Sequence, residues 1–127
     1  MTLTRRFGTV AAAAAALLIL VGCTAAPSAT STGEQLAGTT WSGTDSREND
    51  WEFDFHEDRT LAFSYKGKSF DDPNDTWVVA AGQLRISIEF ADGTATMTGP
   101  YTDGAQSLDL EGSQAGQQGG WTVTITP

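Results

Sequence analysis

The segment Gln83–Phe90 reads QLRISIEF, and this segment decides the fold class of the chain. Its apolar side chains stand at every second position, with Gln, Arg, Ser and Glu between them. A β-strand points successive side chains to opposite faces, so the pattern predicts a strand with one buried and one solvated face. Half-buried strands of this kind are typical of antiparallel sheets.

The same alternation of apolar and polar residues recurs on both sides of this segment. It is clear in WEFDF from Trp51, in TLAFSYK from Thr60 and in WTVTITP from Trp121. Turn sequences such as HEDRT, AAGQ, ADGT and TDGA separate the runs closely enough for hairpin connections. We therefore predict eight short strands: Thr39–Asp45, Trp51–His56, Thr60–Lys66, Thr76–Ala80, Gln83–Phe90, Thr94–Gly99, Ser107–Glu111 and Gly120–Thr126.

Eight antiparallel strands in a meander predict an all-β domain that closes into a small barrel or half-barrel, or folds as a two-layered sandwich. The domain is expected to span residues 36–127 and has no disulfide, because the chain holds one cysteine. Large aromatic side chains are expected to supply much of its core.

The first 22 residues have the features of a secretory signal peptide. Arg5 and Arg6 precede an apolar run, VAAAAAALLILV, that ends at Val21 and is too short to span a bilayer easily. The adjacent arginines also leave twin-arginine export open beside the general route. We expect residues 1–22 to form a helical signal peptide.

The lone cysteine, Cys23, follows Leu20-Val21-Gly22, an order that resembles the bacterial lipobox. The resemblance implies that the thiol of Cys23 carries a lipid after the preceding segment is removed. Residues 23–35 are rich in Ala, Ser, Thr, Pro and Gly, which predicts a flexible tether behind the lipid. The protein is therefore expected outside the cytoplasm, anchored to the cell membrane.

The segment after Cys23 is strongly acidic. It holds five cationic and all sixteen acidic residues, a formal net charge of −11. Such a charge disfavours nucleic acid and anionic lipid headgroups as partners, so attachment to a membrane is expected through the lipid alone.

The order of motifs resembles a known group of proteins. LAGTTWSGTDS precedes a Trp-x-Phe-x-Phe strand, a Thr-Leu-x-Phe strand, DTWVVAAGQLRISI and a terminal Trp-Thr-Val-Thr-Ile. This order is similar to that of small lipocalin-like lipoprotein domains of bacterial, particularly actinobacterial, envelopes. Gly38 and Trp41 also resemble the first-strand Gly-x-Trp of calycins, with one extra residue between them. The resemblance implies a barrel or half-barrel, sometimes with a pocket.

Two acidic clusters are candidate metal sites. Glu52, Asp54 and His56 share one face of a strand, but alternation predicts that this face is solvated. The loop SFDDPNDT offers oxygen ligands without the spacing of an EF-hand, and its Asp-Pro-Asn is strong turn chemistry. We predict no metal, no cofactor and no catalytic residue, because no recognised catalytic motif is present.

The function expected from these observations is non-catalytic binding. One hypothesis is a pocket for a small hydrophobic ligand, lined by some of Trp41, Trp51, Tyr65, Trp77 and Trp121. These rings could equally fill the core, because small barrels fill their interiors. The alternatives are an envelope protein that presents its acidic face to another protein, and an enzyme inhibitor acting through the loop 115–119.

Overall fold

The computed structural model describes residues 31–127, and the predicted signal peptide and Cys23 lie outside the described residues. The described chain forms one sheet in which every strand pairs antiparallel with the next. This confirms the predicted all-β meander of eight strands. The strands are β1 (Thr39–Thr44), β2 (Asp50–Phe55), β3 (Thr60–Tyr65), β4 (Lys68–Ala80), β5 (Gln83–Phe90), β6 (Gly93–Pro100), β7 (Leu108–Gln114) and β8 (Trp121–Ile125).

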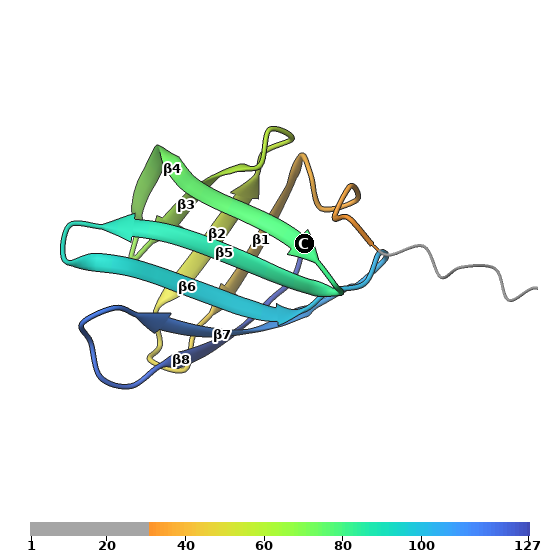
Figure 1. Cartoon of the computed structure of the whole chain (residues 1–127). Helices are drawn as coiled ribbons and strands as arrows, with labels where there is room; N and C mark the ends of the chain where they lie inside the picture. The colour runs from red at the N-terminus through yellow and green to blue at the C-terminus, as the bar shows by residue number, and fades with distance from the viewer. Residues whose placement is uncertain (1–30) are drawn as a thin grey trace, which may run out of the picture.

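The sheet curls into a nearly closed barrel that fits a lipocalin-like fold (Figure 1). The seam between β1 and β8 is held by backbone bonds: Ser42 and Thr126 exchange two at 2.8 and 2.9 Å, and Ser46 donates to Thr122 at 2.8 Å. A Cβ on Gly43 would lie 2.0 Å from the carbonyl oxygen of Thr124, so β8 approaches β1 this closely only because position 43 is glycine. Closure leaves little unpaired strand edge.

The barrel has two different ends (Figure 1). In a meander, alternate connections lie at the same end, so the β1–β2, β3–β4, β5–β6 and β7–β8 connections surround one end, here called the mouth. The segment before β1 covers the opposite, closed end, where the side chain of Leu36 is fully buried. The chain enters the barrel and β8 finishes at this closed end.

The interior between the two ends is packed with the inward-facing residues of all eight strands. Fully buried side chains include those of Phe53, Leu61, Leu84, Ile86, Ile88, Met97 and Ile125. Their alternation with exposed neighbours along β2, β5 and β8 matches the period-two pattern of the sequence. The predicted core-filling role of the apolar face is confirmed over these strands.

β4 is longer than the predicted Thr76–Ala80, because it begins at Lys68. Its first half pairs with β3 as far as Asp71, and the pairing with β3 resumes at Thr76, where the pairing with β5 begins. Residues 72–75 lie at a register shift between the two halves. Every residue from Lys68 to Asn74 is exposed, so this half-strand has no apolar face to reveal it in the sequence.

Candidate binding pocket at the mouth of the barrel

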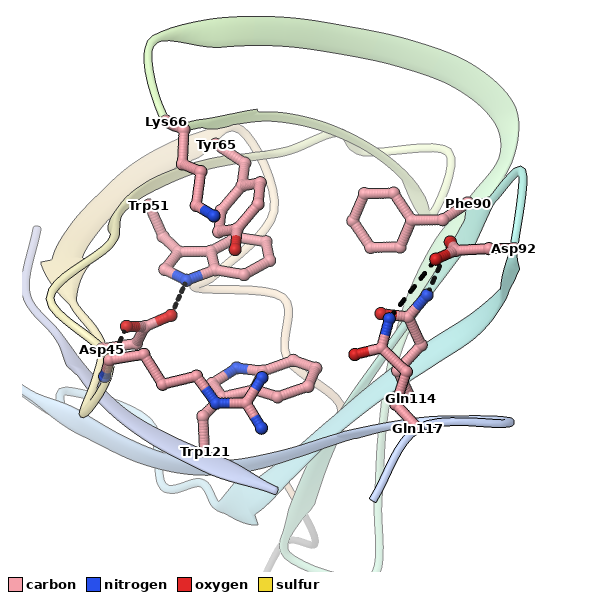
Figure 2. Close-up of a pocket in the computed structure, with 10 residues that line it drawn as sticks. Asp45, Trp51, Tyr65, Lys66, Phe90, Asp92, Gln114, Gln117 and Trp121 are labelled. Carbon is pink, nitrogen blue, oxygen red and sulfur yellow. Dashed lines mark hydrogen bonds between the residues drawn. The ribbon is translucent and has the colours of Figure 1, made fainter. Parts of the chain in front are cut away.

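A pocket of about 320 Å³ opens at the mouth (Figure 2). This volume is at the lower end of the range for small-molecule sites. Residues from all four connections of this end, or from the strand ends beside them, line the pocket. They are Asp45, Arg47, Trp51, Tyr65, Lys66, Phe90, Asp92, Gln114, Gln117 and Trp121.

Aromatic rings form the apolar wall of the pocket. The ring centroids of Trp51 and Tyr65 are 4.3 Å apart, and those of Tyr65 and Phe90 are 6.4 Å apart. The indoles of Trp51 and Trp121 are nearly parallel, at 7° and 6.2 Å between centroids. Trp51, Tyr65 and Trp121 lie at strand ends on the inward-facing positions of β2, β3 and β8, which is why they converge at the mouth.

Trp121 reaches its position because β7 carries a glycine beneath it. A Cβ on Gly112, the residue that pairs with Trp121, would lie 2.2 Å from Cε2 and 2.4 Å from Nε1 of the indole. The ring therefore lies directly on the backbone of β7. Its side chain is 7 % exposed, and its Nε1–H has no hydrogen-bond partner within residues 31–127.

Asp45 organises the β1–β2 connection and holds Trp51 in place. One carboxylate oxygen accepts from the backbone N–H groups of Arg47 and Asn49, at 2.8 and 2.9 Å. The other accepts from Nε1 of Trp51 at 2.8 Å, and the Asn49 amide donates to both oxygens at 3.2 Å. Burial alone would raise the pKa of Asp45, but these donors outweigh it and hold the pKa below the ordinary 3.8.

Asp92 links the β5–β6 and β7–β8 connections across the mouth. Its two carboxylate oxygens accept from Nε2 of Gln114 at 2.8 Å and from Nε2 of Gln117 at 3.3 Å. Figure 2 shows both amides converging on this carboxylate. Both acidic residues of the pocket are thus engaged by donors of the protein itself.

Two cations complete the lining. The guanidinium of Arg47 lies 5.4 Å from the ring centroid of Trp121 and donates to the carbonyls of Gly119 and Gly120, at 3.1 and 3.2 Å. The ammonium of Lys66 lies 5.0 Å from the ring centroid of Tyr65. The loop 115–119 therefore forms part of the rim of the pocket. This is the loop through which an enzyme inhibitor was predicted to act.

The structure brings three of the five candidate ligand residues together and leaves two elsewhere. Trp51, Tyr65 and Trp121 line the mouth pocket, and Trp41 and Trp77 do not. Trp41 is buried in the wall of the barrel, where its Nε1 donates to Oγ1 of Thr39 at 2.9 Å.

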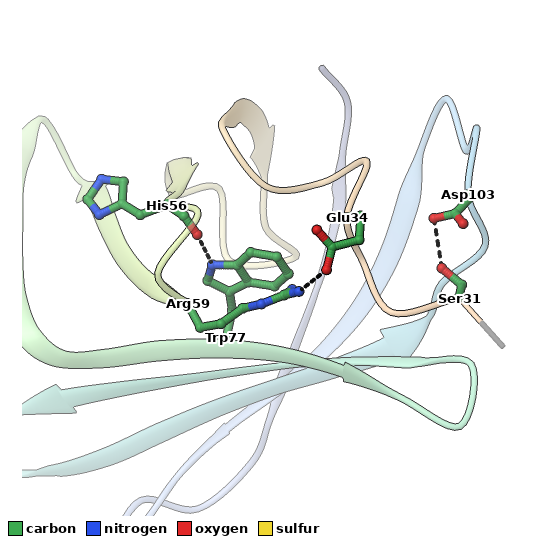
Figure 3. Close-up of polar contacts among 6 residues, drawn as sticks. All are labelled: Ser31, Glu34, His56, Arg59, Trp77 and Asp103. Carbon is green, nitrogen blue, oxygen red and sulfur yellow. Dashed lines mark hydrogen bonds and ion pairs between the residues drawn. The ribbon is translucent and has the colours of Figure 1, made fainter.

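Trp77 belongs to the closed end, where it helps to fix the segment before β1 (Figure 3). Its Nε1 donates to the backbone carbonyl of His56 at 3.1 Å, and the guanidinium of Arg59 lies 4.3 Å from its ring centroid. Arg59 also pairs with Glu34 at 2.9 Å. Gly33 packs against Trp77 and Val79, so at least this residue of the predicted tether, residues 23–35, is packed on the barrel.

Residues of the two candidate metal clusters form hydrogen bonds within the protein. Asp54 accepts a hydrogen bond from Thr40, and Nδ1 of His56 bonds with Oγ1 of Thr60 at 2.9 Å. Asp72 accepts from the backbone of Asn74 at 2.9 Å, as an Asp in a turn does. No three His, Cys, Asp or Glu residues in the described range are grouped closely enough to hold a metal ion.

Asp75 is the other buried carboxylate of the described chain. It is 1 % exposed and accepts from the backbone N–H of Glu89 at 2.8 Å, which ties the irregular part of β4 to β5. Burial, together with the nearby charges of Asp72, Glu89 and Asp71, raises its pKa above the ordinary 3.8 despite that hydrogen bond.

Sequence reasoning missed the polar half of the pocket, because it considered aromatic residues alone. The missed residues are Asp45, Arg47, Lys66, Asp92, Gln114 and Gln117, together with the aromatic Phe90. A usable signal was present: in a meander the alternate turns share one end, so polar residues of those four turns had to meet.

The described residues contain no helix capable of crossing a membrane. Comparisons of the chain with family models, with curated proteins and with solved structures find no match.

Proposed function

We propose that the protein is an exported bacterial envelope lipoprotein that binds a small ligand at the mouth of its barrel and performs no catalysis. The observation that carries the proposal is the pocket itself. It combines the rings of Trp51, Tyr65, Phe90 and Trp121 with a polar rim, the usual composition of a small-molecule site. The packed interior below it favours a ligand held at the mouth over one enclosed deep in the barrel.

The anchoring part of the proposal rests on Cys23 and the sequence before it. In this proposal the lipid on Cys23 attaches the protein to the extracytoplasmic face of the membrane, and residues 23–35 provide most of the tether. Because the chain enters the barrel at the closed end, the mouth would point away from the attachment.

The four tryptophans provide a direct test of where a ligand binds. The full chain, labelled with ¹⁵N and reconstituted in lipid nanodiscs, is titrated with neutral aromatic probes such as 2-naphthamide. Each indole N–H gives a separate NMR signal. We expect the signals of Trp51 and Trp121 to shift on binding, while those of Trp41 and Trp77 serve as internal controls and stay in place.

The proposal fails if no small probe moves the Trp51 and Trp121 signals at millimolar concentration. It also fails if the probes shift the signals of Trp41 and Trp77 instead. A variant that fills the pocket, Phe90→Trp, should weaken binding. Val78→Thr is the matched control, because Val78 is 48 % exposed and does not line the pocket.

A further inference from the structure

The two cations of the mouth pocket have no carboxylate partner. Within residues 31–127, the ion pair with N–O contact inside 4.0 Å joins Arg59 and Glu34 at the closed end. Arg47 and Lys66 line the pocket without such a pair, although the domain is rich in acidic residues. Unpaired cations in a partly enclosed, aromatic-walled pocket favour an anionic group on whatever fills it.

The acidic residues of the same pocket are in the opposite situation. Asp45 accepts hydrogen bonds from three residues, and Asp92 accepts from two glutamines. Donors of the protein therefore already satisfy both carboxylates, and a cationic ligand would have to compete with them. Among the charged groups of the pocket, the ammonium of Lys66 makes no hydrogen bond or ion pair within residues 31–127, and the guanidinium of Arg47 has N–H donors left beyond those it gives to Gly119 and Gly120.

The buried indole N–H of Trp121 points to the same kind of ligand. Trp121 is 7 % exposed and lines the pocket, yet its Nε1 donor has no partner among the described residues. Buried donors are normally satisfied. The nitrogen of this donor is shielded from solvent and would lie 2.4 Å from a Cβ on Gly112, so an acceptor on a ligand reaches it only if the ring turns toward the pocket. The guanidinium of Arg47 lies 5.4 Å from the centroid of the same ring, so a cation stands beside this indole.

From these observations we infer that the mouth pocket selects a small, flat, anionic ligand of the aromatic carboxylate class. The flat body would lie against the rings of Trp51, Tyr65 and Phe90, and the carboxylate would accept from Lys66 and Arg47. The inference rests on the proposed function and adds the chemical class of its ligand. The modest volume of about 320 Å³ limits the ligand to one or two fused rings with short substituents.

The inference is tested with three probes that share one ring system and differ in charge. Isothermal titration calorimetry compares 2-naphthoate, neutral 2-naphthamide and cationic 2-naphthylmethylammonium on the full chain in lipid nanodiscs, with empty nanodiscs as the reference. We expect 2-naphthoate to bind at least about tenfold more tightly than 2-naphthamide, a difference of about 1.4 kcal/mol. The preference should fall as ionic strength rises.

Two charge-neutralising variants test whether the preference for 2-naphthoate over 2-naphthamide arises in the pocket. Lys66→Gln should reduce the affinity for 2-naphthoate much more than the affinity for 2-naphthamide, and so remove most of the advantage of the carboxylate probe. Arg85→Gln changes the net charge equally but alters an exposed residue outside the pocket, so it should preserve the advantage.

Equal affinity for 2-naphthoate and 2-naphthamide would overturn the anionic class and leave the proposed function standing. Tighter binding of the ammonium probe would do the same, and would show that Asp45 and Asp92 dominate the pocket. If none of the three probes binds, both the inference and the proposed function fail. An equal loss of preference in Arg85→Gln would show a general charge effect and overturn the assignment to the pocket.

Discussion

Replacing Asp45 with asparagine should destabilise the domain through one specific contact. An asparagine side chain keeps one oxygen, which can still accept from the backbone of Arg47 and Asn49. Its amide nitrogen then occupies the position of the oxygen that lies 2.8 Å from Nε1 of Trp51, so two donors face each other. Trp51 is only 4 % exposed and Asp45 only 6 %, so little water reaches this contact to replace the lost acceptor.

The magnitude follows from the two losses involved. A hydrogen bond to a charged group contributes about 1.5–3 kcal/mol, and an unsatisfied buried donor costs about 1–3 kcal/mol, with considerable overlap between the two. We therefore expect Asp45→Asn to lower the free energy of unfolding by about 2–3 kcal/mol at pH 7. Urea unfolding of the chain from Thr24 onward, followed by far-ultraviolet circular dichroism, measures this change.

A double-mutant cycle identifies the contact responsible. Trp51→Phe removes the indole N–H, so Asp45→Asn should cost at least about 1 kcal/mol less in that background. Asp50→Asn is the matched control, because Asp50 is exposed and accepts only a surface bond from Thr44. A loss below about 0.5 kcal/mol, or an equal loss in both backgrounds, would refute this explanation.

The pH dependence of the same variant provides a second check. The pKa of Asp45 is lowered in the folded state, so its stabilisation is present above the unfolded value near 3.8 and disappears as pH falls through the folded pKa. The difference between the wild type and Asp45→Asn should therefore shrink below about pH 3.8. A difference that stays constant down to pH 2.5 would contradict the assigned pKa shift.

Three further predictions concern other parts of the chain. Asp75 has a raised pKa in the folded state, so the folded state loses stability as pH rises through the folded pKa of this group. Asp75→Asn should therefore raise the free energy of unfolding at pH 7. Urea titrations near pH 3.5 should show no such increase for the variant. Gly112→Ala should push the Trp121 indole at least about 1.2 Å off β7 and cost about 1–3 kcal/mol, with Ser113→Ala as the neutral control; an unchanged Trp121 N–H signal would contradict this. Cys23→Ser should abolish incorporation of labelled palmitate and give a protein that is either released from membranes or left uncleaved; unchanged palmitate incorporation and lipid-dependent membrane fractionation would exclude the lipid anchor on Cys23.

The strands that were predicted well from the sequence are those with one buried and one solvent-exposed face. Buried and more exposed residues alternate along β2, β5 and β8, because each of these strands lies between the packed interior and solvent. The first half of β4 does not cover the packed interior. Its residues are exposed, and residues 68–71 belong to a strand because they pair with β3. Composition alone does not reveal such pairing.

The candidate site shows a similar division. Alternation identified Trp51, Tyr65 and Trp121 as inward-facing, but it could not distinguish a ring that lines a pocket from one that fills the core. Trp77 demonstrates the difference: it is as large and as inward-facing, yet it packs beneath the segment before β1. The end of the barrel at which a residue lies decides its role, and that depends on which strands run in which direction.

Both ends of the described part of the chain, residues 31–127, lie at the closed end, and this has a practical consequence for attaching the protein to a surface. Immobilising the domain through a residue before Gly33, or through Pro127, places the attachment at the far side of the barrel from Trp121. A biosensor chip, a fluorescent fusion or an affinity tag could use either terminus and leave the aromatic pocket facing the solution.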